Sequence, residues 1–266
     1  MHVPPRPSVR ELHGLPLRVF VVDSAPELAA LLARELVDVV RGELAANRDP
    51  VLGLATGRTP LALYAEFARL VAEERLDLSR LTSFHLDEYL GLPRDHPASF
   101  RARMREVLYR RIGHPDERAK FPVECDRTEG LDGACADYER AIVESGGIAW
   151  QLLGIGLNGH VAFNEPGATA DSRTRVVQLS ESTRRANRPD FGPGEEVPRR
   201  AVTVGIATIR DARRLRLVAL GRSKARIVRE LLHSLVSSAI PATLLREHSG
   251  AELWCDAAAA GELHRD

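Results

Sequence analysis

A glycine-rich segment with one histidine and one glutamate is well suited to acid/base chemistry. It reads LGIGLNGHVAFNEPG over residues 153–167, with His160 and Glu165 five positions apart. The apolar run at residues 148–155 predicts a buried strand that ends at the glycines, and open α/β sheets bind ligands beyond such strand ends. Taken alone, the segment fits either an acid/base pair or a structural histidine.

Two adjacent carboxylates, Asp87 and Glu88, follow an apolar strand predicted at residues 81–86. Adjacent side chains of an extended chain point in opposite directions, so one carboxylate can face a cleft while the other holds the loop. Burial raises the pKa of a carboxyl group and makes its carboxylate a better base toward a carbon acid. A surface turn and a pair of metal ligands are the alternative interpretations of the same residues.

Two turns are suited to binding an anion. Residues 55–60 read ATGRTP, in which Thr56, Gly57, Arg58 and Thr59 precede a predicted helix. The N–H groups and the positive dipole at a helix start attract a phosphoryl group. The turn lacks the pattern G-x-x-x-x-G-K-[ST] of a nucleoside-triphosphate loop. The second turn is GRSK at residues 221–224, and its Lys224 is one of two lysines among 37 basic residues.

The elements that must position these motifs alternate between strands and helices. Strands are predicted at residues 17–22, 51–55, 81–86, 148–155, 175–179, 201–206, 215–220 and 253–255, and longer helices at about 24–39, 60–70, 99–111, 132–145 and 221–235. Such alternation is typical of βαβ units. We predict an α/β fold with a single open, mostly parallel, Rossmann-like sheet and helices on both faces. A flexible N-terminal tail at residues 1–14 would precede one domain at residues 15–266.

All four motifs follow predicted strands, so a parallel sheet would bring them to one edge, where ligands bind. Together they predict an enzyme for a small phosphorylated substrate. Its chemistry would be acid/base catalysis by carboxylate and imidazole, without a cofactor or a metal.

The composition excludes several other classes of function. The 266 residues contain 37 basic and 37 acidic side chains, and a net charge of zero gives no electrostatic signature of nucleic acid or anionic membrane binding. The three scattered cysteines form neither a disulfide framework nor a paired metal motif. We see no signal peptide and no apolar run long enough to span a membrane, and so expect a cytoplasmic protein.

The chain resembles the glucosamine-6-phosphate deaminases, also called isomerases, over roughly residues 17–257. The resemblance is carried by LGLATGRTPLALY (52–64), LDEYLGLPRDHPASF (86–100), LLGIGLNGHVAFNEPG (152–167), SRTRVVQLSESTRRAN (172–187), VPRRAVTVGIATI (197–209) and GRSKA (221–225). The related 6-phosphogluconolactonases share the fold and the GxG…GH turn, but are not expected to carry FNEP or the Asp-Glu-Tyr loop. The resemblance implies conversion of glucosamine 6-phosphate to fructose 6-phosphate and ammonia, a hydrolase/isomerase reaction on an amino-sugar phosphate.

The resemblance also implies roles for individual residues. Asp87 would move the proton between C2 and C1 of the open-chain amino sugar, and His160 would catalyse ring opening at the ring oxygen. Glu165 would pair with His160 and tune it, next to Asn158, at a position where some members have Asp and others Asn. The phosphate would lie against Thr56, Gly57, Arg58 and Thr59, with Lys224 opposite and Arg188 as a further charge.

Several positions depart from the family pattern. Asn158 carries no charge, so the pKa of His160 should depend mainly on Glu165. Arg58 replaces a small residue, and either binds the phosphate or points outward. Arg188 lies in a divergent and shortened loop. Val177 stands about where allosterically regulated members have a basic residue, so we expect no activation by N-acetylglucosamine 6-phosphate.

Other functions compatible with the sequence are a deaminase or isomerase for another amino-sugar phosphate, such as galactosamine 6-phosphate, and a non-catalytic sugar-phosphate sensor. The retained Asp87, His160 and Glu165 disfavour the sensor, and the FNEP loop disfavours a lactonase. The expected partner is the sugar phosphate. A homo-oligomer is possible.

Overall fold

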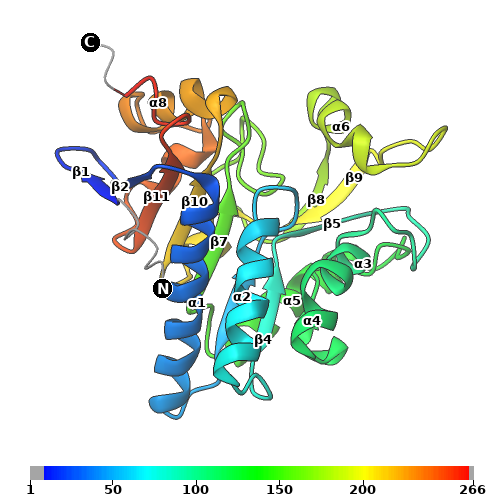
Figure 1. The fold of residues 1–266 in the computed structure, drawn as a ribbon. Coiled ribbons are helices and arrows are strands. Elements are labelled where there is room, and N and C mark those ends of the chain that lie inside the picture. The colour runs from blue at the N-terminus through cyan, green and yellow to red at the C-terminus, as the bar shows by residue number, and fades with distance from the viewer. Residues whose placement is uncertain (1–8, 264–266) are drawn as a thin grey trace.

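The computed structural model of the protein describes residues 9–263. Its main sheet contains β1 (Arg10–Leu12), β2 (Arg18–Val22), β3 (Val51–Leu54), β4 (Thr82–His85), β6 (Ala119–Lys120), β7 (Trp150–Gly154), β10 (Leu215–Ala219) and β11 (Ala251–Asp256). Their order across the sheet is β1-β2-β11-β10-β7-β3-β4-β6 (Figure 1). β1 is antiparallel to β2 and the other neighbours are parallel. The predicted open, mostly parallel α/β sheet is therefore confirmed.

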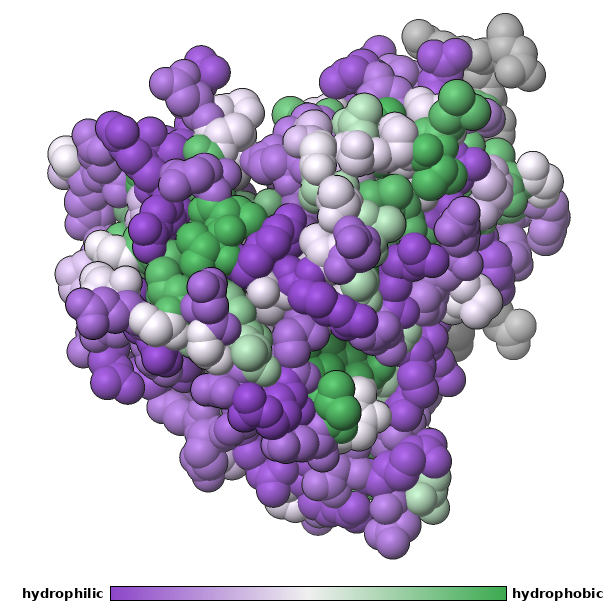
Figure 2. All heavy atoms as spheres, turned by 180° about the vertical axis from the view of Figure 1, so that it is seen from behind, coloured by the Kyte–Doolittle hydropathy of each residue, from purple (hydrophilic) through white to green (hydrophobic). Residues whose placement is uncertain are grey.

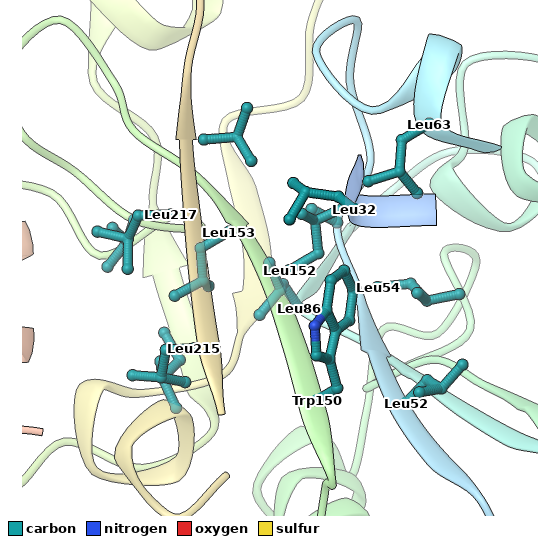
Figure 3. Packing of buried hydrophobic residues seen from close by; sticks show 14 of the residues in the cluster. Leu32, Leu52, Leu54, Leu63, Leu86, Trp150, Leu152, Leu153, Leu215 and Leu217 are labelled. Atoms are coloured by element: carbon teal, nitrogen blue, oxygen red, sulfur yellow. The ribbon is translucent and has the colours of Figure 1, made fainter. Parts of the chain in front are cut away.

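The centre of the sheet is a continuous apolar core, because every residue of β3 and of β10 is buried. Strands covered on both faces need apolar side chains on both, which explains the apolar sequence of β3. The one charged residue of β10, Arg216, is buried because it pairs with Glu35 and Glu252. Figure 3 shows leucines and one tryptophan of β3, β7 and β10 packed against residues of the covering helices: Leu52, Leu54, Trp150, Leu152, Leu153, Leu215, Leu217, Leu32 and Leu63.

Eight α-helical segments are seen among residues 9–263. They are α1 (Ala25–Ala45), α2 (Leu61–Glu74), α3 (Phe100–Met104), α4 (Arg110–Ile112), α5 (Leu131–Glu144), α6 (Glu181–Asn187), α7 (Ile206–Arg210) and α8 (Ala225–His233). A π-helical turn at Arg105–Tyr109 joins α3 to α4, so the helix predicted at residues 99–111 is present but not uniform. None of the helices in this part of the chain is long and apolar enough to cross a membrane.

Helices α1 and α2 lie side by side on one face of the main sheet (Figure 1). α1 begins where Ser24 accepts a hydrogen bond from the backbone N–H of Glu27, as the Asp-Ser pair predicts. The buried Leu28, Leu32 and Leu36 then recur at helical spacing along one face. This packing fixes α2, and with it the β3–α2 turn, against the sheet.

A second sheet, which we did not predict, contains β5 (Asp87–Tyr89), β9 (Arg200–Thr203) and β8 (Arg175–Gln178), in the order β5-β9-β8 and antiparallel throughout. It lies beside the main sheet (Figure 1). Asp87 was expected in a loop, but it pairs with Thr203 at the end of β9. The reason is long-range backbone pairing, which the local sequence around Asp87 does not reveal.

The N-terminal boundary needs a partial correction. Residues 1–8 of the predicted flexible tail lie outside the described residues. Arg10–Leu12 of the same tail form β1, because their backbone groups pair with Val19–Val21 of β2. The face shown in Figure 2 is mostly hydrophilic, and its apolar side chains gather in separate areas.

Candidate active site

A cavity of about 460 Å³ opens at the carboxyl ends of β10, β7, β3 and β4, which are consecutive neighbours in the sheet. The chain continues from β3 toward β4 on one side, whereas β7 leads to β10 and β11 on the other. The cavity therefore lies where the strand order reverses, the usual ligand position of an open α/β sheet. Its volume is in the range of small-molecule sites. Its wall includes the predicted Thr56, Gly57, Thr59, Asp87, Asn158, His160 and Lys224.

Asp87 presents a buried carboxyl group to this cavity. Burial, together with the charge of the adjacent Glu88, raises the pKa of Asp87 to about 8. None of the described residues donates a hydrogen bond to its carboxylate, so no protein group stabilises the charged form. Once ionised, this carboxylate is a strong base for its type, and its lone pairs remain available to a ligand.

His160 is connected to Glu165 through Asn158 rather than directly. Nδ1 of His160 lies 2.7 Å from Oδ1 of Asn158, and Nδ2 of Asn158 lies 2.7 Å from Oε2 of Glu165. The direct distance from His160 Nδ1 to Glu165 Oε2 is 3.8 Å. The expected pairing of His160 with Glu165 is thus indirect, because the amide of Asn158 occupies the space between them.

This chain of hydrogen bonds fixes the proton position on His160. An ionised Glu165 only accepts hydrogen bonds, so the NH₂ group of Asn158 must face it and the amide oxygen must face His160. That oxygen also only accepts, so Nδ1 of His160 carries the hydrogen. Nε2 then keeps a lone pair, and no described protein group binds it. His160 therefore offers a proton acceptor to the cavity that it lines.

The electrostatics keep His160 neutral and Glu165 charged. Burial lowers the pKa of His160; Glu165 opposes this shift, and Lys224 adds to it. Burial tends to raise the pKa of Glu165, but hydrogen bonds from Thr183 and Asn158 outweigh it and the pKa is lowered. The prediction that Glu165 dominates the tuning of His160 is wrong in one respect, since burial has the larger effect. Glu165 is still the largest charge effect on that pKa.

The glycine at position 156 allows the imidazole to sit against the backbone. A Cβ atom at Gly156 would lie 2.2 Å from Cε1 of His160, closer than any real contact. Ala162, in the next turn of the same loop, adopts the left-handed conformation at φ 51° and lines the cavity. Strained backbone of this kind persists where the surrounding structure enforces it, as it often does at functional sites.

The anion-binding turn joins β3 to α2. Gly57 has a φ of 105°, which glycine adopts readily, and no side chain caps the N-terminus of α2. Lys224 reaches the cavity from the turn after β10, and its Nζ donates to the carbonyl of Ile155 at 2.7 Å. Burial lowers the pKa of this ammonium group. The two turns therefore flank one region with several donors and a positive charge, as a phosphate requires.

Two arginines predicted near the phosphate do not line the cavity. The side chain of Arg58 is 65% exposed and faces Asp190 at 3.6 Å. Arg188 donates to the carbonyl groups of Phe191 and Gly192 at 3.1 and 3.0 Å. Its position after α6 turns the guanidinium back onto its own loop. Arg58 is thus largely exposed, and its one ion-pair partner in the described residues, Asp190, belongs to the cavity wall.

The cavity wall contains an ion pair that sequence reasoning missed. Arg103 of α3 contacts Asp190 at 2.7 Å, and both residues line the cavity. Asp190 lies in the 3₁₀ turn Arg188–Asp190, far from Arg103 in the sequence. The HPASF segment before Arg103 drew attention only through the resemblance, and no local pattern indicated its partner. Within residues 9–263, no group of three or more His, Cys, Asp or Glu side chains is arranged to hold a metal ion.

Comparison with known proteins adds independent evidence. A family model described as glucosamine-6-phosphate isomerases/6-phosphogluconolactonase matches residues 23–254. A glucosamine-6-phosphate deaminase of Rhodopirellula baltica is 43% identical over 249 residues, 94% of this chain and 97% of that protein. The deaminase of Halothermothrix orenii is 40% identical over 248 residues, 93% of this chain and 100% of that protein.

The solved structures agree with these relatives. A monomeric glucosamine-6-phosphate deaminase has a TM-score of 0.86 and 38% identity, covering 92% of this chain and 99% of that one. A 6-phosphogluconolactonase of Trypanosoma brucei has a TM-score of 0.71 at 24% identity, with 92% of this chain and 98% of that one covered. The second similarity shows the fold alone.

Proposed function

The chain belongs to the family of glucosamine-6-phosphate isomerases and 6-phosphogluconolactonases, and from this premise we propose that it converts glucosamine 6-phosphate and water to fructose 6-phosphate and ammonia. The observation that carries the choice within the family is Asp87, a buried carboxyl without a hydrogen-bond partner in the cavity wall. Proton abstraction from carbon needs such a base, whereas hydrolysis of a lactone breaks no C–H bond.

The first step is opening of the sugar ring. Nε2 of His160 takes the proton of the C1 hydroxyl and returns it to the ring oxygen as the C1–O5 bond breaks, which gives the open-chain aldehyde. The hydrogen bond from Nδ1 to Asn158 holds the ring orientation, and Glu165 stabilises the positive charge that the imidazole gains during the transfer. A histidine suits this role because it can accept and release a proton near neutral pH.

The second step is transfer of a proton from C2 to C1. The Asp87 carboxylate removes the C2 proton, and the electron pair forms the C1–C2 double bond of an enolamine. The π electrons of the C1 carbonyl move to its oxygen, which takes a proton from solvent. Asp87 then returns the proton to C1, while the nitrogen lone pair forms the C=N bond at C2. Water adds to this imine carbon, and the C–N bond breaks to release ammonia and leave the C2 ketone.

The phosphate is proposed to bind between the β3–α2 turn and Lys224. Thr56, Gly57 and Thr59 supply donors at the start of α2, and Lys224 supplies a full charge. Arg58 and Arg188 have no part in this proposal. The ion pair between Arg103 and Asp190 lies on the cavity wall as well, and we assign it no catalytic step.

An ammonia-release assay tests the proposal. The purified protein is incubated in parallel with glucosamine 6-phosphate and galactosamine 6-phosphate, with the Asp87→Asn variant as control. We expect ammonia and fructose 6-phosphate from the first substrate, and at most about one part in 10²–10⁴ of that rate from the variant. Release of ammonia from galactosamine 6-phosphate alone would show that the substrate is the other epimer. Release from neither sugar phosphate would refute the proposed function.

Three features of the molecule remain part of this proposal. The described cysteines Cys125, Cys135 and Cys255 are all free thiols, as is usual in the reducing cytoplasm. We propose a single catalytic domain that begins with β1, since Arg10–Leu12 pair with β2 of the main sheet. We also propose that the enzyme is not activated by N-acetylglucosamine 6-phosphate, while the possible homo-oligomer is a question for light scattering.

A further inference from the structure

Glu88, the neighbour of Asp87, is buried away from the cavity and holds the first turn of α3. Its side chain is 1% exposed, and it does not line the cavity. Oε1 accepts hydrogen bonds from the backbone N–H groups of Tyr89 and Phe100 at 2.8 and 3.0 Å. Oε2 accepts one from Arg101 at 2.9 Å. A single carboxylate therefore connects β5 to the start of α3, twelve residues further along the chain.

This connection joins two parts of the cavity wall. Asp87 comes from β5, while Phe100 and Arg103 come from α3, and all three line the cavity. Ser99 separately caps α3 by accepting a hydrogen bond from the N–H of Ala102 at 3.1 Å. Ser99 stabilises the helix alone, whereas Glu88 also fixes the position of the helix relative to the strand that carries Asp87.

The charged and titratable groups around Glu88 are few. Arg101 of α3 is the cation that affects it most, although the guanidinium of Arg101 is itself paired with Glu124 at 2.7 Å. Cys125 approaches from the segment after β6, and Val202 of β9, its partner in the sheet, is apolar. Burial raises the pKa of Glu88 to about 7, and the three N–H groups and Arg101 oppose this effect. On its own strand the neighbouring titratable groups are Asp87 and Tyr89.

We propose that Glu88 is a positioning residue for the catalytic base: its carboxylate connects β5, which carries Asp87, to the first turn of α3, and it places a buried charge next to Asp87. The inference deepens the proposed function and rests on it. Adjacent side chains on a strand point to opposite faces, so Glu88 acts through the backbone and through its electric field, without touching the substrate. Glu88 thus has two separable effects. One comes from the hydrogen bonds that its side-chain length allows, and the other comes from its charge.

Three variants separate these effects. E88Q keeps the shape but removes the charge, and its NH₂ group cannot accept the hydrogen bond from Arg101. S99A loses one acceptor at the same helix start and no charge, so it is the matched control. E88D keeps the charge but is one methylene shorter. For each variant, the measurement is the pH dependence of kcat/KM for ammonia release, together with kcat and KM at the pH where the rate is maximal.

In E88Q the acidic limb of the kcat/KM profile should move to lower pH by at least about 0.5 pH unit, because loss of the neighbouring charge makes Asp87 easier to ionise. kcat should fall more than KM rises. In S99A the limb should stay at the wild-type pH, because this variant removes no charge near Asp87. E88D should keep the limb and lose kcat. An E88Q profile that coincides with that of S99A would overturn the proposal.

A second measurement is independent of activity. Because Glu88 ionises before Asp87, the charge of Glu88 acts on the titration of Asp87. The infrared band of the Asp87 carboxyl, identified by its loss in D87N, should therefore titrate at lower pH in E88Q than in the wild type, and at the wild-type pH in S99A. An unchanged midpoint in E88Q would overturn the proposal, and if E88Q does not fold, an E88D variant with wild-type kcat would do so. If the wild type releases no ammonia, the proposed function fails, while this titration still decides whether Glu88 acts on Asp87.

Discussion

Replacing Asp87 by Asn should inactivate the protein and should also make its free energy of unfolding less sensitive to a rise in pH. The carboxyl group is buried, faces an open cavity and has no hydrogen-bond partner among residues 9–263. Asn has the same shape and no charge, so the substitution removes no protein contact. What changes is the free energy of ionising a carboxyl group inside the fold.

The size of this effect follows from proton linkage. The pKa of Asp87 rises from 3.8 in the unfolded chain to about 8 in the folded protein. A carboxyl whose pKa is raised by folding stabilises the fold below its unfolded pKa, and this stability is lost as the pH rises toward the folded pKa. Between pH 5 and 7 the folded state holds one proton that the unfolded state lacks. The wild type should therefore lose about 1.4 kcal/mol per pH unit, or about 2.7 kcal/mol over this window, relative to the variant.

Urea unfolding at pH 5, 6 and 7 measures this difference for the wild type and D87N. The matched control is Asp77→Asn, because a backbone hydrogen bond from Ser79 lowers the pKa of Asp77. Asp77 therefore titrates below pH 5 in both states and should not alter the slope. Parallel plots of stability against pH for the wild type and D87N would refute the burial argument and, with it, the assignment of Asp87 as a base of raised pKa.

Five further outcomes are expected from other parts of the protein. Asn158→Leu should lower kcat/KM by about tenfold, the value of one hydrogen bond, because it disconnects His160 from Glu165. Glu165→Gln should move the pH–rate limb that reports His160 to lower pH, because the Glu165 charge raises the pKa of His160. An unchanged profile would contradict the proposed connection between the two residues. Lys224→Met should raise KM by about tenfold or more, and a change confined to kcat would argue against phosphate binding. Arg188→Ala should change KM by less than about twofold, because this side chain binds its own loop, and a large rise would mean that the loop turns inward with substrate. Rate curves should be hyperbolic with and without N-acetylglucosamine 6-phosphate, and a sigmoidal curve that this ligand made hyperbolic would show allosteric control after all.

The chemistry of the site could be predicted from the sequence because its residues lie in short local patterns. Gly156 and His160 follow an apolar strand, as Thr56 and Lys224 do, and the topology of parallel strands carries such turns to one edge. The α/β class follows from the alternation of apolar periods in the same way. These inferences need only residues that are neighbours in the sequence, because a turn that follows a parallel strand is placed at the carboxyl edge of the sheet by the strand itself.

The direction of side chains and the pairing of distant segments could not be predicted this way. Asp87 was expected in a loop and lies in β5. The reason is that β9, more than a hundred residues away in the sequence, pairs with the backbone of β5. Arg188 has the right charge in about the right place, but a 3₁₀ turn directs it to its own carbonyl groups. The Arg103–Asp190 pair joins two segments that no local pattern relates.

The residue types of an acid/base site, the anion-binding turns and the main sheet that joins them can all be recognised in the amino-acid order. The position of Asn158 between His160 and Glu165, and the connection of Asp87 to α3 through Glu88, become visible in the folded chain. The difference arises because strand and helix periods depend on near neighbours along the chain. The proton position on His160 and the basicity of Asp87 depend on which distant groups fill the space around them, and on how completely those groups exclude water.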